Sequence, residues 1–204
     1  MGVISGLRRL FGGGVPEKQA EGVYVRARLN ARVQPIDRGE YFEDPLDEFL
    51  REAGLGEVTG GGTQMAEEPA GIEFCDVEIR LTDDSDETVA LLIGHLEGLG
   101  APMGSRLIRE GSEELPFGVL EGLGLFLNGT DLDEEIYSTS DVNHVITECQ
   151  QLIAQGDSFR GHWQGSRETA LYFYGPSFAE MRAAIEGFVA EYPLCQRARI
   201  EQIA

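Results

Sequence analysis

The stretch that decides the fold is residues 23–33, Val-Tyr-Val-Arg-Ala-Arg-Leu-Asn-Ala-Arg-Val. Apolar residues occupy every odd position from Val23 to Val33, and the even positions carry polar or amphipathic side chains. This strict alternation is typical of a strand with one buried face and one open face. The segment therefore predicts a central strand. Its open face carries an arginine row, which we define as Arg26, Arg28 and Arg32.

The composition is that of a globular chain with a strong acidic excess. The 204 residues include 16 basic and 36 acidic ones, which gives a formal net charge of −20. A nucleic-acid-binding protein needs a basic surface that neutralises phosphates, so we expect no nucleic-acid partner. The acidity suits a basic protein partner or a small molecule, or it only keeps the chain soluble.

The cysteines and the first residues indicate a cytoplasmic protein. Cys75, Cys149 and Cys195 form no Cys-x-x-Cys pair, and their odd number leaves one unmatched, so reduced and buried thiols are expected. Gly12–Gly14 interrupts the opening apolar residues before they reach the length of a signal peptide or a transmembrane segment.

Residues 1–21 are predicted to be an appendage followed by a linker. Residues 1–11 have the pattern of one short amphipathic helix, which is marginal in water unless it docks. Three docking places stay open for this segment: the protein's own surface, a partner, or, weakly, an anionic membrane.

Residues 22–110 are predicted to form a first unit of strand, helix, strand, strand, helix and strand. After the organising strand, Asp44 and Pro45 have the pattern of a helix N-cap and first helical position. Three glycines interrupt the next predicted strand, and they mark either a bulged edge or a site where another backbone or a ligand comes close. The later predicted elements are the Gly60–Gly62-containing strand 57–67, strand 72–81, helix 85–99 and strand 106–110.

Residues 118–204 repeat this order after a predicted linker at 111–117. Apolar positions of helix 85–99 recur in the helix that follows Pro176, and Pro102 recurs as Pro193. The predicted elements are strand 118–127, a helix capped by Ser140, strands 159–164 and 170–174, the helix opened by Pro176, and strand 196–203.

The repeated order resembles the ferredoxin-like βαββαβ unit, here in tandem over residues 22–204. The resemblance implies an α+β fold with two antiparallel sheets, each covered by helices on one face only. It is a resemblance to a fold, which hosts many functions, and it transfers no catalytic residue.

In such a unit the first and third strands are neighbours, so the arginine row would lie beside Asp76 and Glu78 on the uncovered face. Two interpretations follow for Arg28 and its neighbours. They form a lattice of cross-strand ion pairs, each worth a few tenths of a kcal/mol to about 1 kcal/mol, or they form a polar recognition surface.

The uncovered face of the second unit is predicted to be aromatic. It carries Phe126 with Tyr172 and Tyr174, or else Leu171 and Phe173. An uncovered aromatic face is expected to meet something, unless the two halves pack sheet against sheet or edge to edge and hide it internally. The neighbouring strand holds the only tryptophan, so the predicted binding residues of this half are His162, Trp163, Gln164, Tyr172 and Tyr174.

No motif in the sequence marks a reactive centre. A nucleophile elbow, a His-Glu-x-x-His helix, paired Cys-x-x-Cys motifs, an EF-hand loop and a Gly-rich phosphate loop are all absent. His95, His144 and His162 are scattered, and His162 is the best candidate among them because it neighbours Trp163. The sequence thus predicts no catalytic residue, no metal and no cofactor.

These observations favour a non-enzymatic interaction protein of bacterial type that binds a basic partner through its open sheet faces. Its physical character suits an inhibitor or immunity-type protein that masks a basic toxin or nuclease. The alternative is a small-ligand-binding or enzymatic ferredoxin-like protein with a pocket around Trp163, His162, Tyr172 and Tyr174.

Overall fold

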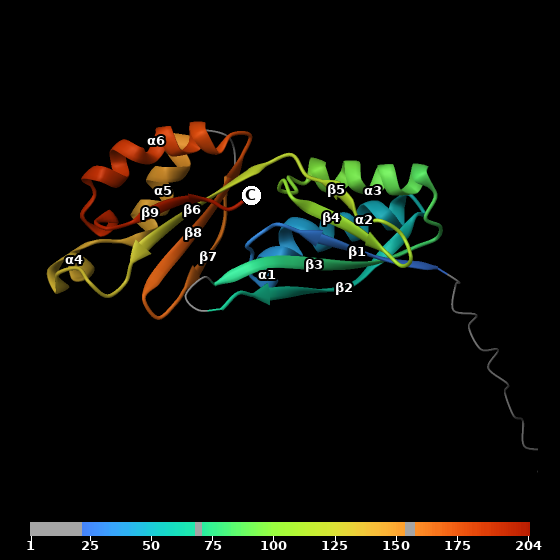
Figure 1. Ribbon diagram of the computed structural model, residues 1–204, viewed down its shortest axis with the longest axis horizontal. Helices are drawn as coiled ribbons and strands as arrows, with labels where there is room; N and C mark the ends of the chain where they lie inside the picture. The colour runs from blue at the N-terminus through green and yellow to red at the C-terminus, as the bar shows by residue number, and fades with distance from the viewer. Residues whose placement is uncertain (1–21, 68–70, 154–157) are drawn as a thin grey trace, which may run out of the picture.

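The computed structural model describes residues 22–67, 71–153 and 158–204. It shows a mixed α+β chain with two antiparallel sheets and helices, arranged side by side along the long axis of the molecule (Figure 1). The predicted helix in residues 1–11 lies outside the described residues.

The first half of the chain forms a five-stranded sheet in the order β2-β3-β1-β4-β5, with antiparallel neighbours. The predicted central position of β1 is confirmed, because β1 pairs with both β3 and β4. The elements are β1 (Val23–Leu29), α1 (Pro35–Arg38), a π-helical turn (Gly39–Glu43), α2 (Asp44–Glu52), β2 (Gly56–Met65), β3 (Ile72–Leu81), α3 (Asp86–Gly98), β4 (Ser105–Arg109) and β5 (Leu115–Phe117).

The second half forms a four-stranded sheet in the order β7-β8-β6-β9, again with antiparallel neighbours. Its elements are β6 (Glu121–Asn128), α4 (Glu134–Thr139), α5 (Val142–Ile153), β7 (Phe159–Gln164), β8 (Glu168–Gly175), α6 (Phe178–Glu191), a 3₁₀ turn (Pro193–Cys195) and β9 (Arg199–Gln202).

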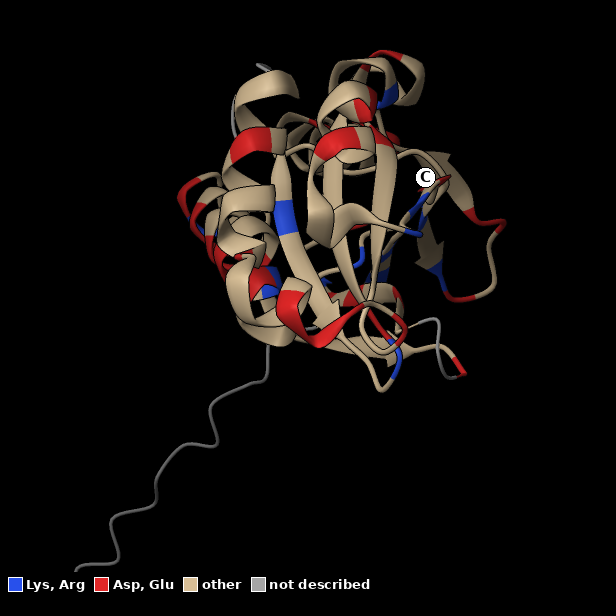
Figure 2. Cartoon of the chain, turned by 90° about the vertical axis from the view of Figure 1, so that its left-hand side faces the viewer, with Lys and Arg blue, Asp and Glu red and all other residues tan. Residues whose placement is uncertain are grey.

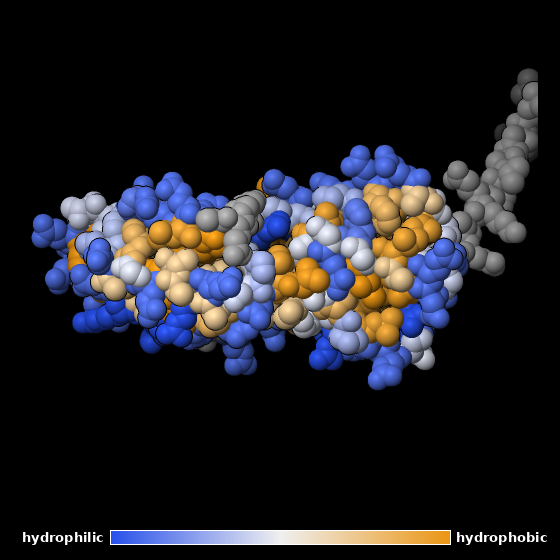
Figure 3. All heavy atoms as spheres, turned by 90° about the horizontal axis from the view of Figure 1, so that it is seen from above, coloured by the Kyte–Doolittle hydropathy of each residue, from blue (hydrophilic) through white to orange (hydrophobic). Residues whose placement is uncertain are grey.

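Each sheet buries one face against its own helices. Alternate residues of β1 and β3, such as Ala27 and Val77, pack against α2 and α3, and alternate residues of β6 and β8, such as Phe173, pack against α5 and α6. All three cysteines are buried and unpaired, and burial raises the pKa of the Cys75 thiol to about 12. Seen from the helix side, apolar residues remain visible over both halves (Figure 3).

The second sheet also buries its other face. Phe126, Tyr172 and Tyr174 form a separate buried cluster with Ala170 and Ile203. A sheet buried on both faces needs cover on the side that its helices leave free, and the first half of the chain provides it.

Two predicted helix caps are wrong. Helix α2 begins at Asp44, but Asp44 is not an N-cap, because the backbone before it is already helical from Pro35, which takes the first position that its missing N–H favours. The π-helical turn before Pro45 supplies a wider turn in which a residue without an N–H is tolerated. In the second half it is Asp141 rather than Ser140 that caps α5, since Asp141 Oδ1 accepts a hydrogen bond of 2.8 Å from the backbone N–H of Asn143.

The predicted linker at 111–117 contains strand β5, which pairs with β4 and extends the first sheet. The strand has only three residues, so it offers no alternation for a sequence pattern to detect.

The glycine-rich segment is a continuous edge strand, β2, and it carries a register shift between Val58 and Gly60. This is the bulged-edge interpretation of the sequence. Gly61 is required by packing, because a β-carbon there would clash with Glu43 Oε1 and lie 2.6 Å from the carbonyl oxygen of Asp76. Packing does not require a glycine at position 62, since a β-carbon there would lie more than 4 Å from every described atom outside its neighbours.

The contrast between these adjacent glycines gives a matched test of the fold. We expect Gly61→Ala to lower the free energy of unfolding by about 1–3 kcal/mol, as overpacking does. Gly62→Ala should leave the free energy of unfolding unchanged or raise it by up to about 1 kcal/mol, because alanine restricts the unfolded chain. Urea denaturation of the two variants measures both values, and equal effects would contradict the placement of β2 against the π-helical turn.

Candidate functional site

Two members of the arginine row, Arg26 and Arg28, are held by one carboxylate. Arg28 and Asp76 are direct cross-strand partners, and Nε of Arg28 lies 3.0 Å from Oδ1 of Asp76. Arg26 Nη1 is 3.8 Å from Oδ2 of the same aspartate, and the Arg28 guanidinium stacks 4.1 Å from the centroid of the Phe74 ring. The hydrogen bond to Asp76 raises the pKa of Arg28. The open face of β1 and β3 therefore holds ordered arginines.

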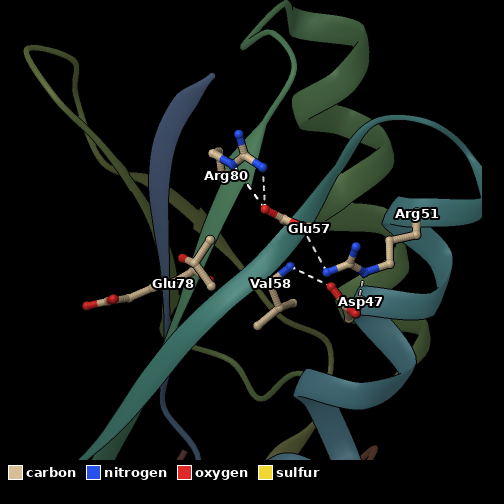
Figure 4. A network of polar contacts seen from close by, with 7 residues as sticks. Asp47, Arg51, Glu57, Val58, Glu78 and Arg80 are labelled. Carbon is tan, nitrogen blue, oxygen red and sulfur yellow. Dashed lines mark hydrogen bonds and ion pairs between the residues drawn. The ribbon is translucent and has the colours of Figure 1, made fainter. Parts of the chain in front are cut away.

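A second polar network joins α2, β2 and β3 at the edge of the same sheet (Figure 4). Glu57 pairs with both Arg80 and Arg51, and Arg51 Nε lies 2.7 Å from Oδ2 of Asp47. Asp47 Oδ1 also accepts a 2.8 Å hydrogen bond from the backbone N–H of Val58, so one carboxylate joins α2 to the edge strand. The hydrogen bond from Arg51 lowers the pKa of Asp47. This network fixes the edge of the sheet.

Glu78 stands outside both networks. It is exposed on the open face, opposite Arg26 in the register of β1 and β3, and Figure 4 shows its side chain pointing away from Arg80 and Glu57. Among the described residues its carboxylate makes no ion pair. The sequence placed it in an ion-pair lattice, but Asp76 alone takes both arginines.

Arg32 does not lie beside Asp76, and its predicted place in the lattice is wrong. The ladder of β1 ends at Leu29, and the chain then runs on toward the second sheet. There the backbone N–H of Arg32 donates a 2.8 Å hydrogen bond to the hydroxyl of Tyr174, and its guanidinium lies 5.9 Å from the Tyr172 ring centroid.

The aromatic face of the second sheet is closed rather than open. Phe126, Tyr172 and Tyr174 are all buried, with Tyr172 at 0% exposure, so the expectation of an exposed aromatic surface is wrong. Burial raises the pKa of the Tyr174 hydroxyl above its ordinary range. Arg32, in the segment that follows β1, contacts both Tyr174 and Tyr172 of this face. This is the internal packing that the sequence left as an alternative.

Further contacts hold the two halves together around this face. Gln34 Nε2 donates a 2.9 Å hydrogen bond to the carbonyl oxygen of His162, and the Arg160 guanidinium lies 4.4 Å from the Tyr41 ring centroid. Gly71, at φ +76°, approaches Trp163 so closely that a β-carbon would lie 2.5 Å from Cδ1 of the indole. The junction is therefore ordered by polar contacts as well as by packing.

Strand β7 separates the predicted binding residues. Trp163 lies on the aromatic side, half-buried beside Gly71. His162 and Gln164 point to the opposite, helix-covered side, where both are exposed. A pocket shared by Trp163, His162 and Tyr172 is therefore not formed, because alternate residues of a strand face opposite sides.

His162 and Gln164 instead line a cleft of about 490 Å³ between β7, β8 and the N-terminal end of α5. Its floor is apolar and includes Leu171 and Ile146, and its rim includes Asp141. The sequence missed this cleft, since it depends on which loops close over the end of the sheet.

The described residues contain no group of three or more His, Cys, Asp or Glu side chains that could hold a metal ion. The three histidines lie apart: His95 stacks on Phe49 with 4.0 Å between ring centroids, and His144 lies 3.9 Å from a carboxylate oxygen of Glu148. No helix among the described residues is both long and apolar enough to cross a membrane.

Comparison with known proteins finds no family model that matches the chain. It likewise finds no curated protein that matches. Among solved structures, an unknown protein from Galdieria sulphuraria is 13% identical, with 89% of this chain and 96% of that chain covered and a TM-score of 0.27. The regulatory subunit of aspartate kinase from Thermus flavus is 15% identical, with 82% and 94% covered and a TM-score of 0.28. The same subunit from Thermus thermophilus, in its ligand-free form, is 15% identical, with 80% and 92% covered and a TM-score of 0.25. Likenesses this weak carry no conclusion about function.

The pairing of Arg28 with Asp76 is a partly exposed ion pair. Replacing Arg28 with alanine should therefore lower the free energy of unfolding by about 1 kcal/mol or less. Denaturation in low and high salt checks this, because salt screens such a pair and should shrink the difference from the wild type. A loss well above 1 kcal/mol that salt does not reduce would show that Arg28 supports the fold in another way.

The hydrogen bond between Arg32 and Tyr174 should contribute more to stability, since its acceptor residue Tyr174 is buried. Tyr174→Phe leaves the Arg32 N–H without its partner and should lower the free energy of unfolding by about 1–3 kcal/mol. Tyr24→Phe is the matched control, because Tyr24 is 65% exposed, and a surface change of this kind stays within about 0.5 kcal/mol. Equal values for the two variants would mean that the halves are not joined through Tyr174.

Proposed function

We propose that the two halves are ferredoxin-like βαββαβ units in tandem, and that the chain is a non-enzymatic, acidic protein-binding module. The strand orders β2-β3-β1-β4 and β7-β8-β6-β9 support the first part, because each unit places its first and third strands at the centre. The binding surface in this proposal is the open face of the first sheet.

The difference between the two sheets supports this choice of surface. The helix-free face of the second sheet is closed by the first half of the chain, whereas the equivalent face of the first sheet keeps its side chains in solvent. Tyr24 is 65% exposed there, and the side chains of Arg26 and Arg28 are 44% and 36% exposed. Tyrosine and arginine are the residue types that most often dominate binding energy at protein interfaces.

The edge strand of this face, β2, carries glycines in place of larger side chains. Gly60 lies beside Glu78, since a β-carbon on Gly60 would be 3.7 Å from Oε2 of that residue, and Gly62 has no neighbour within 4 Å of such an atom. Packing among the described residues does not require Gly62 to be a glycine. A partner side chain can lie directly on the backbone at this point.

The single observation that carries the proposal is that Glu78, beside these glycines, is exposed and makes no ion pair with any described residue. A carboxylate in this position suits a lysine or arginine of the partner, and a net charge of −20 steers a basic protein toward the chain. Acidic residues are spread over the helices and loops (Figure 2), so the whole surface attracts a basic protein at long range. Glu78 determines where on this face a basic residue of the partner binds. The class of protein that this describes is an inhibitor or immunity-type protein that masks a basic partner.

Charge reversal at Glu78 tests the proposal. A partner is first recovered on the immobilised wild-type protein from a native extract, and its affinity is then measured with both proteins pure. We expect a basic partner, and we expect Glu78→Arg to weaken binding by at least about tenfold, which corresponds to 1.4 kcal/mol.

Glu186→Arg is the control, because Glu186 is an exposed residue of α6 in the second half and the substitution changes the net charge equally. It should leave the affinity within about twofold of the wild-type value. Equal losses of affinity in the two variants would show that the partner responds only to the net charge of the chain and not to Glu78. An acidic partner, or no partner at all, would contradict the proposed function.

A further inference from the structure

The cleft in the second half has the form of a small-molecule site and does not touch the proposed protein-binding face. Its volume of about 490 Å³ is within the range usual for ligand pockets. Leu127, Leu171 and Leu194 contribute to an apolar floor, with Val142 and Ile146 from the first turns of α5. An apolar body of the size of one substituted ring would find contact on several sides.

The cleft has several polar side chains, including those of His162 and Tyr137, but its acidic charge lies on one carboxylate. Asp141 is the only acidic residue among its lining residues, and no lysine or arginine accompanies it. Its Oδ1 is occupied, since it accepts hydrogen bonds from the backbone N–H and the side-chain amide of Asn143. Its Oδ2 makes no hydrogen bond to any described residue, and neither do the side chains of Gln164 and Thr169.

The charge of the cleft selects against anions. The N-terminal end of a helix ordinarily attracts an anion, but here the Asp141 carboxylate already accepts the N–H of Asn143, so an added anion would face that carboxylate. A protonated amine meets the opposite situation, because Asp141 can accept a charge-assisted hydrogen bond through its second oxygen. The net charge of the chain favours a cation further.

We infer that this cleft binds a small amine with an apolar body. The ammonium group lies at Asp141, the body lies on Leu171 and Ile146, and Gln164 and Thr169 form the polar wall. The polar wall of the site is linked to the first half, because the carbonyl oxygen of His162, on the same strand as Gln164, accepts a hydrogen bond from Gln34.

Three probes of similar shape test this inference: 2-phenylethylamine, 2-phenylethanol and phenylacetate, each titrated into the full-length protein by calorimetry. A ligand with nine non-hydrogen atoms and ordinary efficiency binds with a Kd of about 1–10 mM. We expect 2-phenylethylamine to bind with one-to-one stoichiometry in this range. The alcohol and the acid should each bind at least about tenfold more weakly, because they lack the charge-assisted hydrogen bond.

Two variants and one control locate the binding. Asp141→Asn keeps a good N-cap for α5 while it removes the charge, so it should weaken amine binding by about tenfold or more without loss of stability. Gln164→Trp, at an exposed strand position, should fill the cleft and abolish binding. Asp133→Asn removes an exposed carboxylate that does not line the cleft, and it should leave the Kd unchanged.

Each remaining outcome overturns the inference. Equal affinity for the three probes would show an apolar cleft without selection for an amine, and preference for phenylacetate would reverse the assigned charge. Binding that survives both Asp141→Asn and Gln164→Trp would place the amine elsewhere. The absence of any binding at about 10 mM would mean that the cleft is not a site for this class of ligand.

Discussion

The structure depends on the burial of one aromatic face. The second sheet presents Phe126, Tyr172 and Tyr174 on the side that its own helices leave free, and large aromatic side chains contribute most when they are removed from water. The first half supplies the cover through the segment that follows β1. Because that segment brings backbone groups into a dry environment, it needs partners there, and the hydroxyl of Tyr174 satisfies the N–H of Arg32. Packing and hydrogen bonding thus act at the same place.

This constraint explains why the two sheets differ in what they offer to a partner. One helix-free face is used within the chain, and the other stays in solvent with its arginines held by Asp76. An ordered arginine loses less side-chain freedom when a partner arrives, so a face that is already ion-paired is better prepared for binding than a set of mobile side chains. Glu78 and the bare glycines of β2 add the local preference for a basic residue.

The sequence predicted the local structure well where a regular pattern exists. The strands at 72–81 and 159–164 have the predicted bounds. In the first of them, alternation over residues 75–81 reports directly which side chains are buried. The same signal misled beyond Leu29. Ala31 and Val33 are buried as predicted, but the β1 ladder has ended there, so the alternation reported burial and not strand pairing. Because successive residues of a strand face opposite sides, Trp163 cannot share a pocket with His162 and Gln164. The prediction that grouped these residues did not apply this rule.

Other features were beyond a sequence pattern for physical reasons. The π-helical turn before Pro45 has no periodicity of its own, and β5 is too short to show any. The cover over the aromatic face depends on contacts between residues more than a hundred positions apart, such as Arg32 and Tyr174, and a single sequence holds no record of such pairs. The cleft at Asp141 likewise exists only because loops and a helix end meet over the sheet.

The most direct test of the account is the hydrogen-exchange rate of the Arg32 amide in the native protein. The structure places this N–H in a hydrogen bond to the buried Tyr174 of the other half, and residues 30–34 belong to no helix or strand. The amide should therefore exchange as slowly as the amides of the β1 ladder, such as those of Ala27 and Leu29. Exchange at the rate of an unprotected loop, with β1 still protected, would show that the first half does not close the aromatic face of the second sheet.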